Sequence, residues 1–492
     1  MIDTKQKSEA EPAQLAMPAG DPAAADIEMP AHYAAERLGT EPVGRLLLRF
    51  AAPAVTGMVV NALYNVVDRI FVGRGVGEAA LGGLALAMPL MTISMAFSML
   101  FGVGAANMIS IRLGQQRREE AENALNHCLL LLVGSGLLFM ALGLVFLEPL
   151  FALMGAQEGS EAIAYAQDYF RIILYGQVFS MVGFGLSHCS RAQGFPMVTM
   201  VGMIIGAGMN MVLDPLFIFV FHWGVGGAAW ATIISQLAAA VWVLSFNFSK
   251  RAVIKLRPKT FRPSLRIVGH IMSFGSAQFL LQVAASCVQF LYNFSMSLYG
   301  VAALGVANGG DVALSGMNIV SSVILMILMP VFGINQGAQP ILGYNYGAKK
   351  FDRVRKAYLL AVTAATAICC VGFLASVLFP DAIIRLFAPD GSPSLLTFTP
   401  RAMRVVMLML PVTGFQIVSS NMFIVTGRPK TSIVLSMLRQ VIVLIPSLLL
   451  FGWLWGLNGV LAATPVADGV AALVAGAMIA IELRNLKAGM DT

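Results

Sequence analysis

Two acidic residues inside otherwise apolar segments are the clearest candidates for chemistry in this sequence. Asp68 lies in the apolar stretch 45–72, and Asp214 lies in the stretch 196–221. An ionised side chain at the centre of a bilayer costs about 2.5–3.5 kcal/mol, so each carboxylate needs a partner, water or a proton. The acids therefore indicate a site for a proton or a cation. The alternative is that Arg69 neutralises Asp68, or that Asp68 lies close to the outer membrane surface.

Other oxygen-bearing side chains accompany Asp214. Asn210 precedes it by four residues, which places both side chains on one face of a helix. Pro215 follows and cannot donate to the carbonyl oxygen of Met211, so we expect the helix to kink there. Thr232 in the next apolar segment adds a hydroxyl group. The expected all-oxygen cluster suits a shared proton or a hard cation such as Na⁺, and it comprises Asp68, Asn210, Asp214 and Thr232.

The composition places these residues in a membrane protein. Of 492 residues, 58% are hydrophobic and only 12% are charged, whereas about a quarter of the residues in soluble proteins are charged. The apolar blocks exceed about 18 residues, the length that an α-helix needs to cross a bilayer. Barrel strands would be about 10 residues long with alternating polarity. Lys and Arg lie at the ends of apolar blocks rather than on one basic face, which argues against a nucleic-acid partner.

We expect an all-α integral membrane protein with twelve transmembrane helices and both termini in the cytoplasm. An even number of spans places the termini on one side, and the loops that are rich in Lys and Arg mark that side as cytoplasmic. Those loops lie near 112–118, 191, 250–266, 349–356 and 428–430. The expected spans are 45–72, 79–108, 123–150, 163–190, 196–221, 225–248, 267–299, 309–345, 357–387, 400–426, 431–452 and 456–483.

The sequence repeats itself with an offset of 233 residues at several landmarks, and with slightly different offsets in other segments. Gly77-Glu78-Ala79-Ala80-Leu81-Gly82-Gly83 recurs as Gly310-Asp311-Val312-Ala313-Leu314-Ser315-Gly316, and the same offset relates Gly104-Ala105 to Gly337-Ala338. Two pseudo-symmetric six-helix bundles of like orientation should therefore enclose a central cavity. The expected organisation is a disordered cytoplasmic tail 1–43, an N-lobe 44–249, a basic linker 250–266, a C-lobe 267–485 and a C-terminal tail 486–492.

The two halves differ at the acidic positions. Asp68 aligns with Met296, and Asn210 and Asp214 align with Ile442 and Pro446, so the second half lacks these polar groups. Asp468, which aligns with Gln236, is a second acidic candidate. From the matching Leu-Tyr-Asn segments and the position of Asp68, the expected substrate cavity includes Tyr64, Asn65, Asn293 and Met296.

Several segments resemble the multidrug and toxic compound extrusion (MATE) family, most closely its bacterial MepA-like branch. They are "LYNVVDRIFVG" with Pro53 upstream, "NMVLDP", "GVGGAAWAT" and "MPVFGINQGAQPILGYNYGAKK". The resemblance covers nearly the whole chain beyond the N-terminal tail. It implies export of cationic or amphipathic organic compounds by alternating access of two lobes, driven by an inward gradient of H⁺ or Na⁺.

The resemblance also implies residue roles. Position by position, the family's cation-coupling residues fall on Asp68, Asn210, Asp214 and Thr232, and its bending proline falls on Pro53. Pro215 is the second expected hinge. Acidic residues that the NorM-like branch uses in its C-lobe have no clear counterpart here. We expect no cofactor apart from the transported H⁺ or Na⁺, and a monomer in the cytoplasmic membrane of a bacterium.

Other classes fit the sequence less well. A membrane enzyme would need a nucleophile with its base or a set of metal ligands, and the sequence contains neither HExxH nor GxSxG. The five cysteines lie in apolar stretches without CxxC spacing, so neither a disulfide nor a zinc site is expected. The main rival is a lipid-linked oligosaccharide flippase of the same wider superfamily. Its cavity should carry cationic residues for pyrophosphate, whereas the buried charges placed here are acidic.

Overall fold

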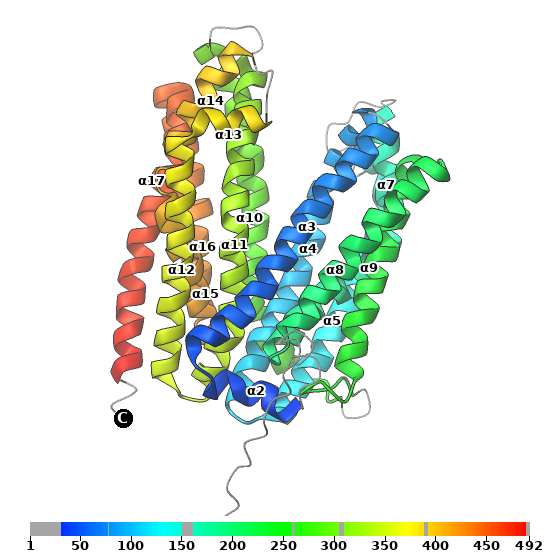
Figure 1. Cartoon of the computed structure of the whole chain (residues 1–492), viewed down its shortest axis with the longest axis vertical. Helices are drawn as coiled ribbons and strands as arrows, with labels where there is room; N and C mark the ends of the chain where they lie inside the picture. Colours follow the sequence, from blue (N-terminus) through cyan, green and yellow to red (C-terminus); the bar gives the residue numbers. More distant parts are fainter. Residues whose placement is uncertain are drawn as a thin grey trace, which may run out of the picture.

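A computed structural model describes residues 31–76, 78–149, 161–257, 261–304, 309–387 and 392–488. The described part of the chain is helical and contains no β-strand. Figure 1 shows two bundles of long helices that meet at one end and diverge toward the other. The predicted all-α fold of two helical bundles is confirmed.

The N-lobe comprises the first group of long helices. Their sequences are apolar around most of the circumference, as expected for helices that face lipid on one side and protein on the other. They are α3 (Val43–Gly75), α4 (Glu78–Gly114), α5 (Arg118–Val145), α7 (Glu161–Ala192), α8 (Pro196–Pro215) with the π-helical turn η1 (Leu216–Val220), and α9 (Gly224–Phe248).

The C-lobe repeats this arrangement with more breaks. Several of its helices begin at proline, which lacks an amide hydrogen and fits the first helical turn at no cost. The elements are α10 (Leu265–Leu304), α11 (Gly309–Gly347), α12 (Phe351–Leu378), α13 (Pro380–Phe387), α14 (Pro393–Val406), α15 (Leu410–Val425), α16 (Pro429–Met437), the π-helical turn η3 (Leu438–Leu444) and α17 (Ile445–Ala488).

The described helices account for the expected spans. Ten are long and apolar enough to cross a membrane, and α14 with α15, bent by 47°, makes an eleventh. The last of the ten runs from Pro429 to Asn485 and contains Gly456, whose φ of 57° and ψ of −136° are not helical. This backbone conformation is essentially restricted to glycine. Gly456 therefore divides two spans, and counting them separately gives the predicted twelve.

Two expectations about the ends of elements were wrong. Part of the predicted disordered tail is the helix α2 (Ala31–Thr40), which is held because Asn345 Nδ2 donates to the carbonyl oxygen of the buried Leu38 at 2.7 Å. Residues 1–30 lie outside the described part. The predicted span 357–387 is two helices, since α12 ends at Leu378 and Pro380 begins the short helix α13.

The lobes touch at the end that carries α2 (Figure 1). Helix α4 packs against α10 and α11, and α3 packs against α11. A Cβ atom on Gly114 would lie 2.0 Å from the carbonyl oxygen of Tyr344, and one on Gly347 would lie 2.2 Å from that of Ile111. The sequence repeat relates Gly114 to Gly347 and Ile111 to Tyr344, so this is one pseudo-symmetric contact made twice. Small residues let the two backbones approach this closely.

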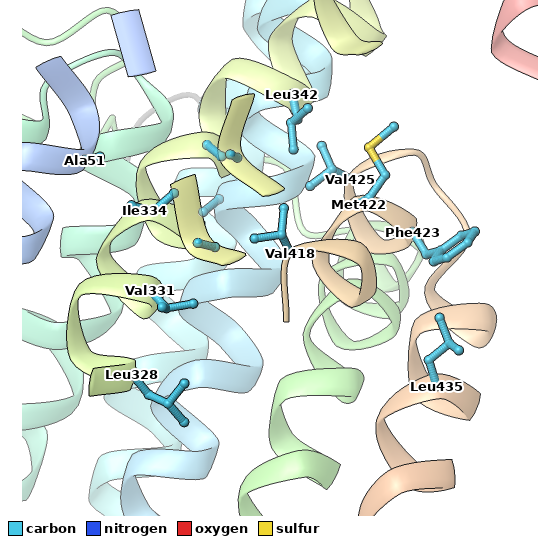
Figure 2. Packing of buried hydrophobic residues seen from close by; sticks show 14 of the residues in the cluster. Ala51, Leu328, Val331, Ile334, Leu342, Val418, Met422, Phe423, Val425 and Leu435 are labelled. Carbon is cyan, nitrogen blue, oxygen red and sulfur yellow. The ribbon is translucent and has the colours of Figure 1, made fainter. Parts of the chain in front are cut away.

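Buried aliphatic side chains fill the interior of each lobe. Figure 2 shows part of the C-lobe core, where Val418, Met422 and Val425 of α15 lie between that helix and α11. From α11, Ile334 and Leu342 complete the layer. This packing fixes α15, whose polar face borders the cavity described below.

Candidate functional site

The predicted polar cluster is assembled in the N-lobe. Asp214 is buried on the last turn of α8, and Asn210 Nδ2 donates to its Oδ1 atom at 3.2 Å. The same amide group donates to Oγ1 of Thr232 on α9 at 3.4 Å. The four-residue spacing thus places Asn210 between the carboxylate and the hydroxyl group.

Helix α3 brings a second carboxylate to this cluster. Asp68 is buried and lies close enough to Asp214 for the two carboxyl groups to interact through their charges. Two buried carboxylates repel each other, so a proton on one of them, donated to the other, is favoured. The pair therefore forms a place where one proton can be held between two helices.

Two tyrosines complete the cluster. Tyr64 on α3 and Tyr169 on α7 each bring a hydroxyl group to the side chain of Thr232 and interact electrostatically with both acids. Tyr169 was missed in the sequence. Its segment, "YAQDYF", offers no spacing signal, and only the packing of α7 against α9 brings it to Thr232.

The backbone changes form directly beside Asp214. The α-helix ends at Pro215 and continues as the π-helical turn η1. Proline has no amide hydrogen, so the regular hydrogen-bond ladder is interrupted there. The expected irregularity at Pro215 thus takes the form of a π-turn, a feature that often marks functional sites. Pro53, the other expected hinge, lies inside the continuous helix α3.

A cavity of about 190 Å³ lies within the N-lobe next to the cluster. Tyr64, Asn210 and Thr232 line it, together with Ala207 and Gln236. The cluster thus has direct access to a space that is large enough for several water molecules.

A larger cavity of about 460 Å³ lies between the lobes. Asn61 and Met203 line both cavities, so the two spaces adjoin. Its N-lobe wall is largely apolar and includes Met58, Met95, Met99 and Met203. Its C-lobe wall is largely polar and includes Gln278, Gln282, Asn335, Gln336, Gln339, Gln416, Asn421, Arg439 and Gln440.

Arg439 corrects the expectation that the buried charges are acidic. Its Nε atom donates to Oδ1 of Asp468 at 2.5 Å, and its side chain lines the central cavity. The sequence analysis singled out Asp468 without this partner. A basic residue in the middle of the predicted span 431–452 was the available signal.

The expected substrate-cavity residues are only partly brought together. Tyr64 lines the N-lobe cavity. Met296 is fully buried in the C-lobe core, and Asn293 lies on an exposed face of α10, where its Oδ1 accepts from Gln289. Neither belongs to the described lining of these two cavities, so the assignment of both residues to the substrate cavity stays a prediction. The side chain of Asn65 lies outside the described residues.

A metal centre of the usual kind is not found in the part of the chain that the structure describes, where three or more His, Cys, Asp and Glu side chains nowhere converge. The oxygen atoms of the cluster are of the type that binds a hard cation such as Na⁺. Chemically, such an arrangement suits a single proton or a single small hard cation.

The MatE family profile matches residues 53–216 and 283–449, one match in each lobe. The chain belongs to the MatE family.

Among similar proteins, the multidrug export protein MepA of Staphylococcus aureus strain MRSA252 is 25% identical over 453 residues, covering 92% of this chain and 96% of MepA. Its counterpart from Staphylococcus haemolyticus is 24% identical, covering 90% of this chain and 94% of the relative. A solved outward-facing multidrug resistance MATE transporter superposes with a TM-score of 0.84 at 26% identity, covering 92% of this chain and 98% of that one. A MATE structure in a bent conformation gives the same score and identity, with coverage of 93% and 99%.

Proposed function

We propose that the protein is an antiporter that exports cationic or amphipathic organic compounds in exchange for H⁺ or Na⁺. The observation that carries the proposal is the buried pair of Asp68 and Asp214, beside a cavity that adjoins the space between the lobes. That similar proteins are named multidrug export proteins supports it. The protein would act as a monomer in the cytoplasmic membrane.

Coupling follows from competition for one negatively charged site. With Asp68 and Asp214 ionised, the N-lobe attracts an organic cation. A proton shared by the two carboxyl groups, or Na⁺ among the oxygens of Asn210 and Thr232, removes that attraction. Binding of the ion and of the substrate would then oppose each other, which an exchanger requires.

The shape of the molecule supports an outward-facing state. The lobes meet at the end that carries α2 and the loop that begins α12, and they diverge toward the other end (Figure 1). The meeting end holds the loops rich in Lys and Arg, which the positive-inside rule places in the cytoplasm. In such a state the transporter releases its substrate outside and takes up the coupling ion.

The test is ethidium uptake into inverted vesicles, with the H⁺ and Na⁺ gradients imposed separately. One of the two gradients should drive accumulation, and Asp214→Asn should abolish it while the protein level stays normal. Accumulation that neither gradient affects would contradict the coupling.

A lipid-linked oligosaccharide flippase is the second candidate, because Arg439 places a cationic group on the central cavity. Arg439 is the one Lys or Arg side chain in the described lining of that cavity, which is too little positive charge for a multiply charged pyrophosphate ligand. A ligand stabilises the state that it binds. Protection from heat by a lipid-linked pyrophosphate, without protection by an organic cation, would favour the flippase.

A further inference from the structure

Arg439 presents its guanidinium group to the central cavity, and Asp468 stands behind it. Arg439 lines the cavity with 24% of its side chain exposed, whereas the side chain of Asp468 is 6% exposed and belongs to α17 behind the lining. The bond to Asp468 uses Nε. The edge formed by Nη1 and Nη2 therefore remains for a ligand in the cavity. A cation entering from the cavity would meet Arg439 before Asp468.

The internal repeat shows that this pair replaces neutral residues of the N-lobe. The offset that relates Asn210 to Ile442 also relates Ala207 to Arg439 and Gln236 to Asp468. Ala207 and Gln236 both line the N-lobe cavity. The position of Ala207 in the N-lobe is thus taken in the C-lobe by a guanidinium group on the central cavity, and the position of Gln236 is taken by the acid behind it.

Buried amide groups near Arg439 lack hydrogen-bond partners. The Nδ2 atom of Asn421 and the Oε1 atom of Gln416 are buried without a partner, and both residues line the central cavity. A buried polar group that stays unpaired reduces stability. Retention of two such groups on one cavity wall indicates a ligand that pairs with them.

These groups belong to the same wall as Arg439. Ser432 Oγ donates to the carbonyl oxygen of Ser420 at 2.8 Å, which sets α16 antiparallel beside α15. One turn further along both helices, Gln416 lies level with Ser436. The chain continues from α16 into η3, whose first turn carries Arg439. Ser432, Ser436 and Arg439 follow the helical repeat and share the face that lines the cavity.

We propose that Arg439 is a specificity-determining residue of the central cavity, which binds a carboxylate group of those transported compounds that carry one. The guanidinium edge pairs with both carboxylate oxygens, as the fork of arginine allows and the ammonium of lysine does not. Asn421 and Gln416 supply further hydrogen bonds. The amine of the compound points to the N-lobe acids, and its apolar body lies on the methionine wall. Asp468 is a positioning residue that fixes the guanidinium group. The proposal rests on the proposed export function and assigns the residue that recognises an anionic group of the compound.

The test is binding to the purified protein in detergent, measured by fluorescence polarisation with two probes. Rhodamine B carries a carboxylate and a delocalised cation, and its ethyl ester keeps the cation but lacks the carboxylate. Arg439→Gln should weaken rhodamine B binding about tenfold, the scale of one lost charged hydrogen bond, and change ester binding less than about twofold. Arg439→Lys should fall between the wild type and Arg439→Gln.

Three further variants test whether the effect comes from misfolding and whether Asp468 positions Arg439. Arg439→Gln leaves Asp468 buried without its partner, so the double variant with Asp468→Asn removes both charges and should show the same probe selectivity. Asp468→Asn alone should weaken the binding of rhodamine B more than that of its ester. Asp468→Glu should bind rhodamine B with an affinity close to that of the wild type. The matched control is Arg428→Gln, which breaks the ion pair of Arg428 with Glu482 outside the described cavity linings and should leave both probes unaffected.

Equal losses for the two probes, or unchanged binding of both in Arg439→Gln and in the double variant, would overturn the proposal. Tighter ester binding in Arg439→Gln would overturn it too, because Asp468 would then be the group that binds a cation. If rhodamine B binding depends on Arg439 but no ion gradient drives efflux, the carboxylate subsite holds and the coupling fails. If an ion gradient drives efflux but Arg439→Gln affects the binding of both probes equally, the proposed export function holds and only the carboxylate subsite is rejected.

Discussion

Gln339 on α11 donates from Nε2 to Oδ1 of Asn107 on α4 at 2.7 Å, across the boundary between the lobes. Both side chains are buried, and Gln339 also lines the central cavity. The bond therefore lies where the cavity ends and the closed contact between the lobes begins. Such a bond exists only while the lobes are together at this end, so it stabilises the state seen here relative to one in which they separate.

Removal of this bond should shift the balance toward the opposite state. A typical intramolecular hydrogen bond contributes about 0.5–1.5 kcal/mol. Gln339→Ala should therefore raise the fraction of molecules whose lobes are separated at the meeting end about two- to tenfold. Access of a thiol reagent to a cysteine at the buried position Ser110 reports this opening, in a background without native cysteines. Gln282→Ala, on the same cavity wall, is the matched control. Equal labelling of the two variants would contradict the assignment.

The close contact between Gly347 and Ile111 should be more sensitive to substitution than the hydrogen bond of Gln339. Gly347→Ala places a methyl group 2.2 Å from the carbonyl oxygen of Ile111, so the helices must separate. Overpacking of this kind costs about 1–3 kcal/mol, and the melting temperature should fall accordingly. Gly134→Ala on α5, where the new atom meets nothing within 4 Å, should leave it unchanged or raise it. Similar melting temperatures for the two variants would show that the contact is not tight in solution.

The sequence predicted the framework and most of the polar cluster in the N-lobe. The transmembrane spans follow from the length of the apolar stretches, and the two-lobe repeat follows from the spacing of matching segments. The proximity of Asn210 to Asp214 follows from helical periodicity. Tyr169 and the pairing of Arg439 with Asp468 depend on which helices become neighbours, which local periodicity does not encode. Met296 was placed in the cavity because it aligns with Asp68, yet an apolar side chain at that position joins the core. Alignment between the lobes predicts backbone position better than side-chain environment.

The role of Tyr169 can be tested by removing one oxygen atom. Tyr169→Phe deletes the hydroxyl group that reaches Thr232 and keeps the ring that packs in the core. We expect the apparent affinity for the coupling ion to fall about five- to tenfold, as the loss of one hydrogen bond predicts, with little change in thermal stability. The control is Tyr165→Phe, one turn earlier on α7. A Tyr169→Phe variant with wild-type ion dependence would remove this residue from the site.

The orientation can be tested independently of transport. Lys349 lies in the basic loop between α11 and α12, and Asp381 lies in the first turn of α13. The loop that begins α12 is at the meeting end of the lobes, and α13 is near the other end (Figure 1). Cysteine at Lys349 should react with an impermeant thiol reagent only in inverted vesicles, and cysteine at Asp381 only in intact cells. The basis is the excess of Lys and Arg in cytoplasmic loops. The reverse pattern would invert the topology and make the present state inward-facing.

The strongest test concerns the two acids themselves. If Asp68 and Asp214 share one proton or hold one Na⁺, substrate affinity should fall as either ion is raised, because the same carboxylates attract the organic cation. Asp214→Asn and Asp68→Asn should each abolish this competition, since a single carboxylate no longer provides the paired site. Asp168→Asn on the exposed side of α7 is the matched control and should retain it. Affinity is measured for ethidium across pH and Na⁺ concentration with purified protein, so that binding is separated from transport. Competition that survives in Asp68→Asn would show that the pair is not the coupling site. Competition lost equally in Asp168→Asn would show that general negative charge, rather than this pair, governs binding.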